Sequence, residues 1–221
     1  ADCGLSQTSV LFPLAQMTGT TNDTIITVRP VINPVKFHSV VYWLPPAGIQ
    51  LATKNGSATT NLIPNDYNVT IAGAGMWYST VTGTAPGFYG NSAPSPSSNV
   101  HLQNFAIFGN VQERNDSAQV NGIGGAMSNS SVSSVWIDHL KVGAWMDGPM
   151  DKLTFSGLRI RDTTADGVNF HGGVTNSTVT NSDIRNTGDD GIATWADSAL
   201  GADANDTISD NRVTTQILAN G

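Results

Sequence analysis

An eight-residue pattern of hydrophobic and polar positions recurs along this chain. Two apolar residues alternate with other residues, two positions intervene, and the alternation then resumes. Copies of the pattern begin at Val69, Val100, Val135 and Leu153, and weaker copies, with polar residues at some apolar positions, begin at Ser177 and Asp206. Alternation with a period of two residues is typical of a strand with one buried face. Each copy therefore predicts two short strands joined by a bend.

The bend position in each copy holds a residue that tolerates a left-handed backbone. It is occupied by Gly73, Asn104, His139, Gly157, Asn181 and Asp210. Gly, Asn, Asp and His are the residues that most readily adopt a positive φ. We therefore expect a sharp corner in every copy, with the apolar side chains of both strands on its inner side.

The spacing of the copies predicts the fold class. Counted at the third position of the pattern, successive copies lie 18 to 35 residues apart, at Ile71, Leu102, Ile137, Phe155, Val179 and Ile208. Coils of this length leave room for a third strand and predict an all-β, right-handed parallel β-helix, whose stacked coils share one core. A β-sandwich also turns every 8–12 residues or so, but it gives the bend residues no reason to repeat in phase.

The coils imply a single domain over residues 1–221. Clear coils occupy residues 69–213, and residues 40–48 are typical of an earlier rung followed by a turn. Residues 1–40 form a leading segment that the pattern defines poorly. The last copy ends close to the C-terminus with no capping helix, so we expect a truncated helix end that a longer protein would continue.

The composition restricts the classes of molecule that this protein is expected to bind. Only 12% of the 221 residues are charged, the formal net charge is −7, and no basic patch stands out, which argues against nucleic acid. No apolar run approaches the 18 or so residues of a membrane span. We therefore expect a monomer that contacts neither nucleic acid nor membrane.

The sequence indicates the cellular compartment only weakly. The single cysteine, Cys3, cannot form an internal disulfide. Seven Asn-x-Ser/Thr sequons favour a secreted glycoprotein, although a chain rich in Asn, Ser and Thr produces many by chance. They are Asn22, Asn55, Asn68, Asn115, Asn129, Asn176 and Asn205.

Carboxylates fall in phase in two consecutive coils. Asp166 lies six residues after Ile160, and Asp190 lies six residues after Ile184, with no gap between the two coils. Asp189 precedes Asp190 and is level with an alanine of the earlier coil. The three aspartates should therefore converge within one or two rungs, which are about 4.8 Å apart.

Other side chains with suitable chemistry lie close to these aspartates. His171 is level with Trp195, and Asn169 lies two residues before His171. The same count from Val142 places Asp147 level with Asp189, and Trp145 lies nearby. We expect Asn169, His171, Trp195, Trp145 and Asp147 to contact a sugar. Asp147 also has the Gly-Pro sequence of a turn, and the tryptophans other than Trp195 should divide between core and groove.

Clustered carboxylates suit hydrolysis of a glycosidic bond. Like charges at about 5 Å disfavour double ionisation, so the pKa of one group should rise. A carboxyl pair divided into acid and base is what this reaction requires. Asp-Gly pairs also mark turns and brace β-helix corners, and hard cations such as Ca²⁺ bind clustered carboxylates. A structural calcium ion, a non-catalytic carbohydrate-binding β-helix and a purely structural ladder therefore remain alternatives. No catalytic metal or other cofactor is indicated.

These residues carry a family resemblance. The runs Arg161 to His171 and Ile184 to Trp195 resemble the catalytic core of glycoside hydrolase family 87, the α-1,3-glucanases and mycodextranases. Residues 112–117, 121–126 and 142–149 are similar as well, and the resemblance covers roughly residues 69–213. It implies a parallel β-helix, endo-hydrolysis of α-1,3-glucan with inversion, and a catalytic centre matching Asp166, Asp189 and Asp190.

Two related β-helix families offer an alternative substrate. Family 49 dextranases and family 28 polygalacturonases share the Asp plus Asp-Asp arrangement. The polygalacturonase pattern continues with Gly-His-Gly and Arg-x-Lys, and neither follows Asp190. The negative net charge, and an expected lack of a Lys/Arg cluster near the site, also argue against a polyuronide.

We therefore expect a secreted endo-hydrolase of a neutral α-glucan. Asp189 is assigned as the general acid, and Asp166 and Asp190 as the groups that hold and activate a water. Inversion requires room for that water, so the acid and base are expected about 6.5–9.5 Å apart.

Overall fold

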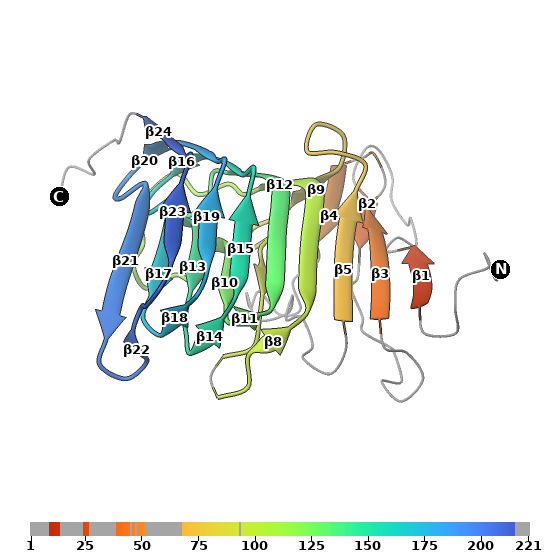
Figure 1. The fold of residues 1–221 in the computed structure, drawn as a ribbon. Coiled ribbons are helices and arrows are strands. Elements are labelled where there is room, and N and C mark those ends of the chain that lie inside the picture. Colours follow the sequence, from red (N-terminus) through yellow and green to blue (C-terminus); the bar gives the residue numbers. More distant parts are fainter. Residues whose placement is uncertain are drawn as a thin grey trace.

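The computed structural model describes residues 9–13, 24–26, 39–44, 46, 48–51, 68–92 and 94–214. These residues form strands stacked coil upon coil along one axis, from the N-terminal end to the C-terminal end (Figure 1). Almost all pairings are parallel, and the single antiparallel pair joins the last two strands of the second sheet. The predicted parallel β-helix is confirmed. Cys3 and the sequons Asn22 and Asn55 lie outside the described residues.

The largest sheet has 14 strands and bends into two halves. Its first path runs through β1 (Ser9–Pro13), β3 (Ser39–Leu44), β5 (Asn68–Gly73), β9 (Val100–Phe108), β12 (Ser130–Asp138), β15 (Leu153–Ser156), β19 (Thr178–Thr180) and β23 (Thr207–Ser209). The second half adds β2 (Thr24–Ile26), β4 (Gly48–Leu51), β6 (Thr80–Thr82), β16 (Arg159–Thr163), β20 (Asp183–Thr187) and β24 (Arg212–Thr214).

Three smaller sheets close the coils. One contains β7 (Phe88–Tyr89), β10 (Asn121–Gly125), β13 (Val142–Met146), β17 (Val168–His171), β21 (Ile192–Asp197) and β22 (Gly201–Ala202). The other two are the pairs β8 (Ser97–Ser98) with β11 (Met127–Ser128), and β14 (Met150–Asp151) with β18 (Val174–Thr175). The described residues contain no helix with the length and apolar character needed to cross a bilayer.

The core consists of apolar side chains stacked in register. Leu102, Val132, Phe155 and Val179 pair in successive coils, and each is fully buried. Each coil thus covers the apolar face of the next, which is why the alternating pattern repeats along the chain.

The observed register corrects the predicted pattern in one coil. Val132, not Ile137, pairs with Leu102 and Phe155, so the true unit begins at Ser130 rather than Val135. The corner of this coil lies at Ser134, which has a φ of 52°. Serine does not favour a left-handed backbone, so the sequence pattern predicted the corner at His139 instead.

His139 belongs to the next corner of the same coil. It has a φ of 51° and is followed in successive coils by Asp162 and Asn186, with φ values of 51° and 55°. In the earliest unit, Gly73 is likewise not the left-handed corner. A loop over residues 74–79 follows it, and Val81 rather than Met76 pairs with the next coil.

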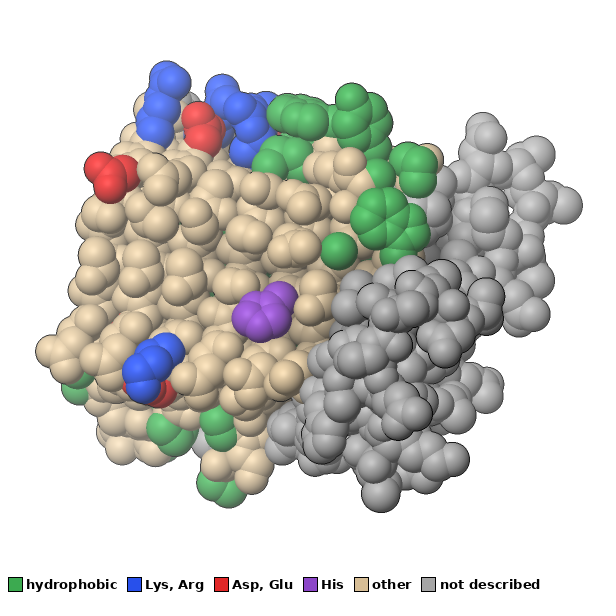
Figure 2. All heavy atoms as spheres, turned by 45° about the vertical axis from the view of Figure 1, so that its right-hand side comes forward, with side chains coloured by type: hydrophobic (Ala, Val, Ile, Leu, Met, Phe, Trp, Pro, Cys, Tyr) green, Lys and Arg blue, Asp and Glu red, His purple; other side chains and the backbone are tan. Residues whose placement is uncertain are grey.

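No tryptophan of the chain is buried in the core, although some were expected there. Trp43, Trp77 and Trp195 are exposed, while Trp136 and Trp145 are half-buried. The surface in Figure 2 is mostly neutral polar, with hydrophobic side chains gathered near one edge beside a few basic ones. The narrow coil interior is filled by aliphatic side chains and Phe, and the larger indole rings lie outside it.

Candidate active site

The predicted stacking of the aspartates is confirmed. Asp166 and Asp190 each follow the second-half strand of their coil, after β16 and β20. The backbone N–H of Asp190 donates to Oδ1 of Asp166 over 3.1 Å. The N–H of Asp189 donates to the carbonyl of Ala165 over 3.3 Å. One carboxylate oxygen from each aspartate lies within 4.8 Å of the others.

The Asp-Gly sequence at this corner has a packing cause. A Cβ on Gly167 would lie 2.4 Å from the carbonyl oxygen of Gly191 in the next coil. Only glycine permits this approach, so close packing between coils explains Gly167. A structural role also explains Asp166 in part, because its carboxylate accepts a hydrogen bond from the next coil. The carboxylate of Asp190, by contrast, accepts no hydrogen bond from the described part of the chain.

The electrostatics of the cluster centre on Asp166. Its side chain is nearly buried, and burial raises the pKa of Asp166 above its ordinary range, helped by the charges of Asp189 and Asp190. Hydrogen bonds from Asn169 Nδ2, at 2.7 Å, and from the Asp190 N–H partly oppose this rise. The expected rise of one pKa is therefore found, and it falls on the most buried member.

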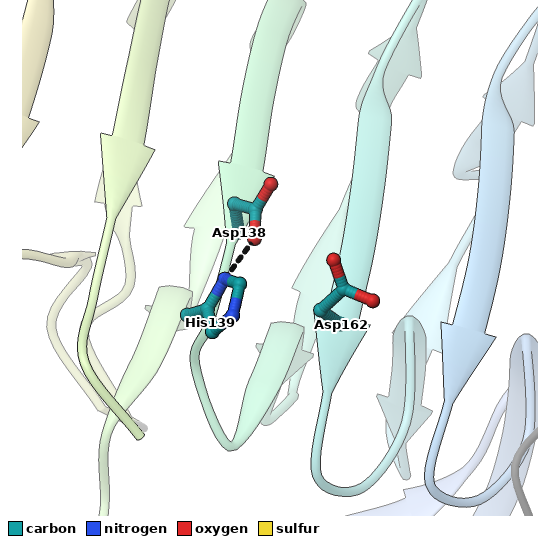
Figure 3. A group of neighbouring side chains, drawn as sticks. All are labelled: Asp138, His139 and Asp162. Atoms are coloured by element: carbon teal, nitrogen blue, oxygen red, sulfur yellow. Dashed lines mark hydrogen bonds and ion pairs between the residues drawn. The ribbon is translucent and has the colours of Figure 1, made fainter. Parts of the chain in front are cut away.

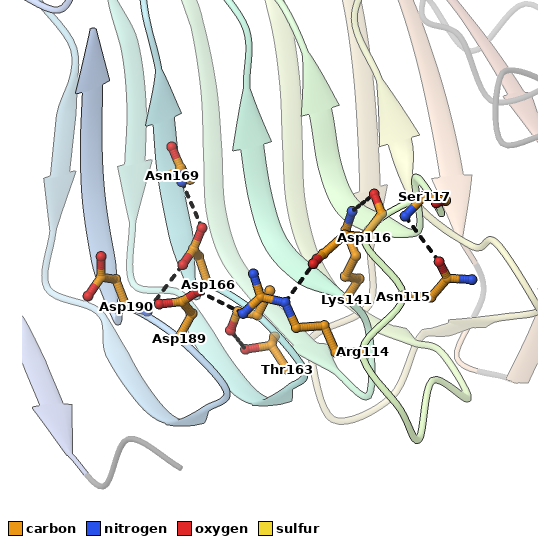
Figure 4. Close-up of polar contacts among 11 residues, drawn as sticks. Arg114, Asn115, Asp116, Ser117, Lys141, Thr163, Asp166, Asn169, Asp189 and Asp190 are labelled. Atoms are coloured by element: carbon orange, nitrogen blue, oxygen red, sulfur yellow. Dashed lines mark hydrogen bonds and ion pairs between the residues drawn. The ribbon is translucent and has the colours of Figure 1, made fainter. Parts of the chain in front are cut away.

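A cation from a distant loop completes the cluster. Arg114 lies in residues 109–120, between β9 and β10. Its Nη1 donates to Asp189 over 2.7 Å, and its Nε donates to Asp116 over 2.9 Å (Figure 4). Lys141, nearly buried beside this loop, donates to the carbonyl of Asp116 over 3.4 Å. Burial lowers the pKa of Lys141.

These two cations correct the expectation that no Lys/Arg cluster lies near the site. Sequence reasoning missed Arg114 because it lies on a loop outside the coils. It missed Lys141, which stacks with Ala165 and Asp189 in successive coils, because the pattern placed that coil in the wrong phase. The available signal was the charged run over residues 112–117, in a chain with few charges. That run was noted only for its family resemblance.

Aromatic side chains form the opposite wall. The His171 ring lies 4.4 Å from Trp145 and 5.4 Å from Trp195, centroid to centroid. The pairing of His171 with Trp195 is as predicted. Asp147 is level with His171 rather than with Asp189, and its Oδ1 lies 3.0 Å from His171 Nδ1. The predicted count failed because Val142 starts a strand of the second sheet, whereas Ile160 lies in the first.

The aspartates, the cations and the aromatic wall enclose one pocket. Its volume is about 320 Å³, and its lining includes Arg114, Asp116, Gln119, Lys141, Trp145, Asp166, Asn169, Asp189, Asp190 and Trp195. Most predicted site residues therefore meet in one place. His171 and Asp147 do not line the pocket, but both contact Trp145, which does.

Two groups of side chains have the composition of a metal site. One is Asp166, Asp189 and Asp190, and the other is Asp138, His139 and Asp162 (Figure 3). The carboxylate oxygens of the first group suit hard cations such as Ca²⁺. In both groups, several carboxylate oxygens already accept hydrogen bonds from the protein.

A model of the α-1,3-glucanase catalytic domain D2 matches residues 46–218, a range that holds every residue of the pocket. The chain belongs to this family. No curated protein matches the chain. Family membership agrees with the resemblance carried by the two aspartate-containing runs.

Solved structures agree with this family. The catalytic unit of a thermostable GH87 α-1,3-glucanase from Streptomyces thermodiastaticus strain HF3-3 is 37% identical, with a TM-score of 0.70, over 82% of this chain and 31% of that chain. The Agl-KA catalytic domain is 30% identical, with a TM-score of 0.62, over 78% of this chain and 32% of that chain.

A more distant relative shows the same fold. It is an aspartate-to-alanine variant of a GH87 α-1,3-glucanase catalytic domain, solved in complex with tetrasaccharides. It is 20% identical, with a TM-score of 0.65, over 91% of this chain and 40% of that chain. The present chain thus spans roughly a third of the solved chains that it matches.

Proposed function

We propose that this protein hydrolyses internal bonds of α-1,3-glucan. The observation that carries the proposal is the cluster of three carboxylates, with oxygens within 4.8 Å of one another, in a pocket with aromatic side chains on one wall. Membership of the α-1,3-glucanase family supports the linkage. The reaction uses only carboxylates and water, so the proposal needs no cofactor.

The three aspartates are given different roles. Asp189 is exposed at the pocket mouth and serves as the general acid for the leaving oxygen. Asp166 and Asp190 hold the water, and the raised pKa of Asp166 makes its carboxylate the stronger proton acceptor. Arg114 holds Asp189 in place in the free protein. Because the carboxylates interact, they exchange protons as a group.

We propose inversion, although the carboxylates lie closer together than the sequence led us to expect. The carboxylate oxygens approach within 4.8 Å, which is closer than the about 6.5–9.5 Å of two groups on opposite faces of a sugar. Inversion here requires that Asp166 and Asp190 share a water beside Asp189. That water then attacks the anomeric carbon from the side away from the leaving oxygen. Retention is the competing outcome, because the short separation suits a nucleophile.

The charge balance of the pocket favours a neutral substrate. Four carboxylates, Asp116, Asp166, Asp189 and Asp190, face two cations, Arg114 and Lys141. Arg114 is already bound to Asp116 and Asp189. A polyuronide would bring further negative charge into a pocket with an excess of carboxylates, so a polygalacturonase-like activity is disfavoured.

We also propose that the protein is a secreted monomer. Five of the sequon asparagines lie in the described residues, and all five are exposed. They are Asn68, Asn115, Asn129, Asn176 and Asn205. Exposure leaves them accessible to glycosylation in a secretory pathway.

The test is release of reducing ends from a panel of polysaccharides. We expect release from α-1,3-glucan, with little from dextran or polygalacturonate, and none from α-1,3-glucan with Asp190→Asn. Binding to α-1,3-glucan without release would instead indicate a non-catalytic carbohydrate-binding β-helix. No binding and no release would leave the aspartates as structural ladder residues.

A further inference from the structure

A second pocket lies on the other side of Arg114. Its volume is about 350 Å³, and its lining includes Gln112, Arg114, His139, Asp162, Thr164 and Asn186. We propose that this pocket is a glucan-binding subsite that holds the sugar chain beyond the catalytic pocket. The inference rests on the proposed function, because it takes the same substrate as its ligand.

The two pockets are adjacent along two consecutive coils of the β-helix. Thr163 and Thr164 line the second pocket, and the next two residues, Ala165 and Asp166, line the first. In the following coil, Gly188 lines the second pocket, and Asp189 lines the first. Arg114 lines both. A chain cut at the aspartates therefore has a path past Arg114 into the second pocket.

The floor of the second pocket is a row of polar side chains from consecutive coils. His139, Asp162 and Asn186 occupy the same corner in register, and all three have a positive φ. Rungs are about 4.8 Å apart, so the row presents a polar group at each step along the helix axis. Such a row suits a polymer with repeated hydroxyls rather than a single small anion.

Hydrogen bonds within the protein fix these side chains and leave acceptors free. Nδ1 of His139 is hydrogen-bonded to Asp138, as Figure 3 shows, and Asp138 also accepts from Trp136 Nε1 over 3.1 Å. Asn186 Nδ2 donates to Asp162 Oδ1 over 3.0 Å. His139 Nε2, Asp162 Oδ2 and Asn186 Oδ1 remain as acceptors for hydroxyl donors.

The charge and the size of the pocket favour a neutral hydroxylated ligand. The acidic side chains in and beside the pocket, Asp138 and Asp162, disfavour an anionic ligand. The volume lies within the range of about 300–1,000 Å³ for small-ligand pockets, which is enough for sugar units but not for a folded partner.

The test compares substrates of different length. His139→Gly and Asn186→Gly remove the side chains and keep the left-handed backbone that both positions require. The double variant should lower kcat/KM for long α-1,3-linked oligosaccharides at least fivefold or so, through KM, as expected for lost hydrogen bonds. The shortest oligosaccharide that wild type cleaves, which does not reach the second pocket, should be cleaved at the wild-type rate.

Asn181→Gly is the matched control. Asn181 has a φ of 50°, is exposed, and lies at a corner outside both pockets. It should leave the rate on every length unchanged. An equal loss on all lengths, or no loss, in the double variant would overturn the subsite. Activity that is lost with a chelator and restored by a metal in wild type, but not in the His139 variant, would assign the row to a metal instead.

Failure of the subsite can be told apart from failure of the proposed function. If wild type cleaves α-1,3-glucan and the double variant shows no dependence on length, only the subsite is wrong. If wild type cleaves no α-1,3-linked substrate, the proposed function is wrong. Binding of uncleaved oligosaccharides, measured by calorimetry, then tests the pocket directly, and equal affinity in wild type and the double variant overturns the subsite there too.

Discussion

Arg114 and Asp189 form an ion pair over 2.7 Å, although 75 residues separate them in the sequence. The guanidinium lies between Asp116 on its own loop and Asp189 on the catalytic corner (Figure 4). Asp116 orients Arg114, and Arg114 orients Asp189. The loop therefore holds Asp189, the proposed general acid, from outside the coil that carries it.

Arg114→Gln should lower kcat more than it lowers stability. The ion pair is partly exposed, so its loss should change the free energy of unfolding by less than about 1 kcal/mol. Without Arg114, Asp189 loses the hydrogen bond that orients it toward the pocket, so kcat should fall with little change in KM. Steady-state kinetics, with a thermal melt, check both parts.

Arg185→Gln is the control for this variant. Arg185 pairs with Asp183 over 3.0 Å, and its side chain is 36% exposed, against 35% for Arg114. It lies outside both pockets. An unchanged kcat in Arg114→Gln, or the same fall in Arg185→Gln, would remove the positioning role of Arg114.

Asp189→Asn and Asp190→Asn should each reduce hydrolysis by about 10²–10⁴-fold, the usual loss when a general acid or base is removed. Both side chains are at least partly exposed, and both changes preserve shape, so the melting temperature should hardly change. Reducing-end assays and thermal melts test this prediction. More than about a tenth of the wild-type rate in either variant is incompatible with the assigned roles.

Asp166→Asn should change how stability depends on pH. Burial raises the pKa of Asp166, so the folded state keeps this proton to a higher pH than the unfolded chain does. Between the ordinary value of about 3.9 and the raised value, the folded state binds more protons. The contribution of Asp166 to stability therefore falls as pH rises through that window.

The variant lacks this titration, so its stability relative to wild type should improve as pH rises from about 4 to 7. Melting temperatures of both proteins across that range provide the measurement. Comparing slopes removes any constant effect of the new amide on its hydrogen bonds with Asn169 and Asp190. A relative stability that is flat, or that declines with pH, would mean that Asp166 has no raised pKa.

Trp195→Ala should weaken binding to insoluble α-1,3-glucan with little effect on folding. The side chain is 55% exposed and contacts His171 at the pocket wall, so it lacks the role of a core residue. A buried tryptophan would instead cost about 3–5 kcal/mol. Trp77→Ala, at a site 60% exposed and outside both pockets, is the comparison. A large fall in melting temperature with normal glucan pull-down would contradict this role.

The coil register could be predicted where the corner residue was informative. Asp166 and Asp190 were placed correctly because their two coils align without a gap. The coil at Ser134 was placed wrongly, because Ser134 has a positive φ although serine is not a residue that favours one. Asp147 was then assigned to the wrong level by the same error of phase.

The remaining features depend on contacts that no local pattern encodes. Arg114 reaches Asp189 from a loop without alternating residues, so its position depends on the folded coils. The second pocket likewise forms only when His139, Asp162 and Asn186 stack at one corner. His139 had been assigned to the preceding corner, which hid its alignment with the other two.

Proton NMR of α-1,3-glucan during hydrolysis, before the products mutarotate, tests the assigned roles of the three aspartates most directly. We expect the β-anomer of the new reducing end to appear first, because water held by Asp166 and Asp190 attacks opposite the oxygen protonated by Asp189. Early appearance of the α-anomer would show retention and contradict these roles. The absence of any new anomeric signal would contradict hydrolysis of this glucan.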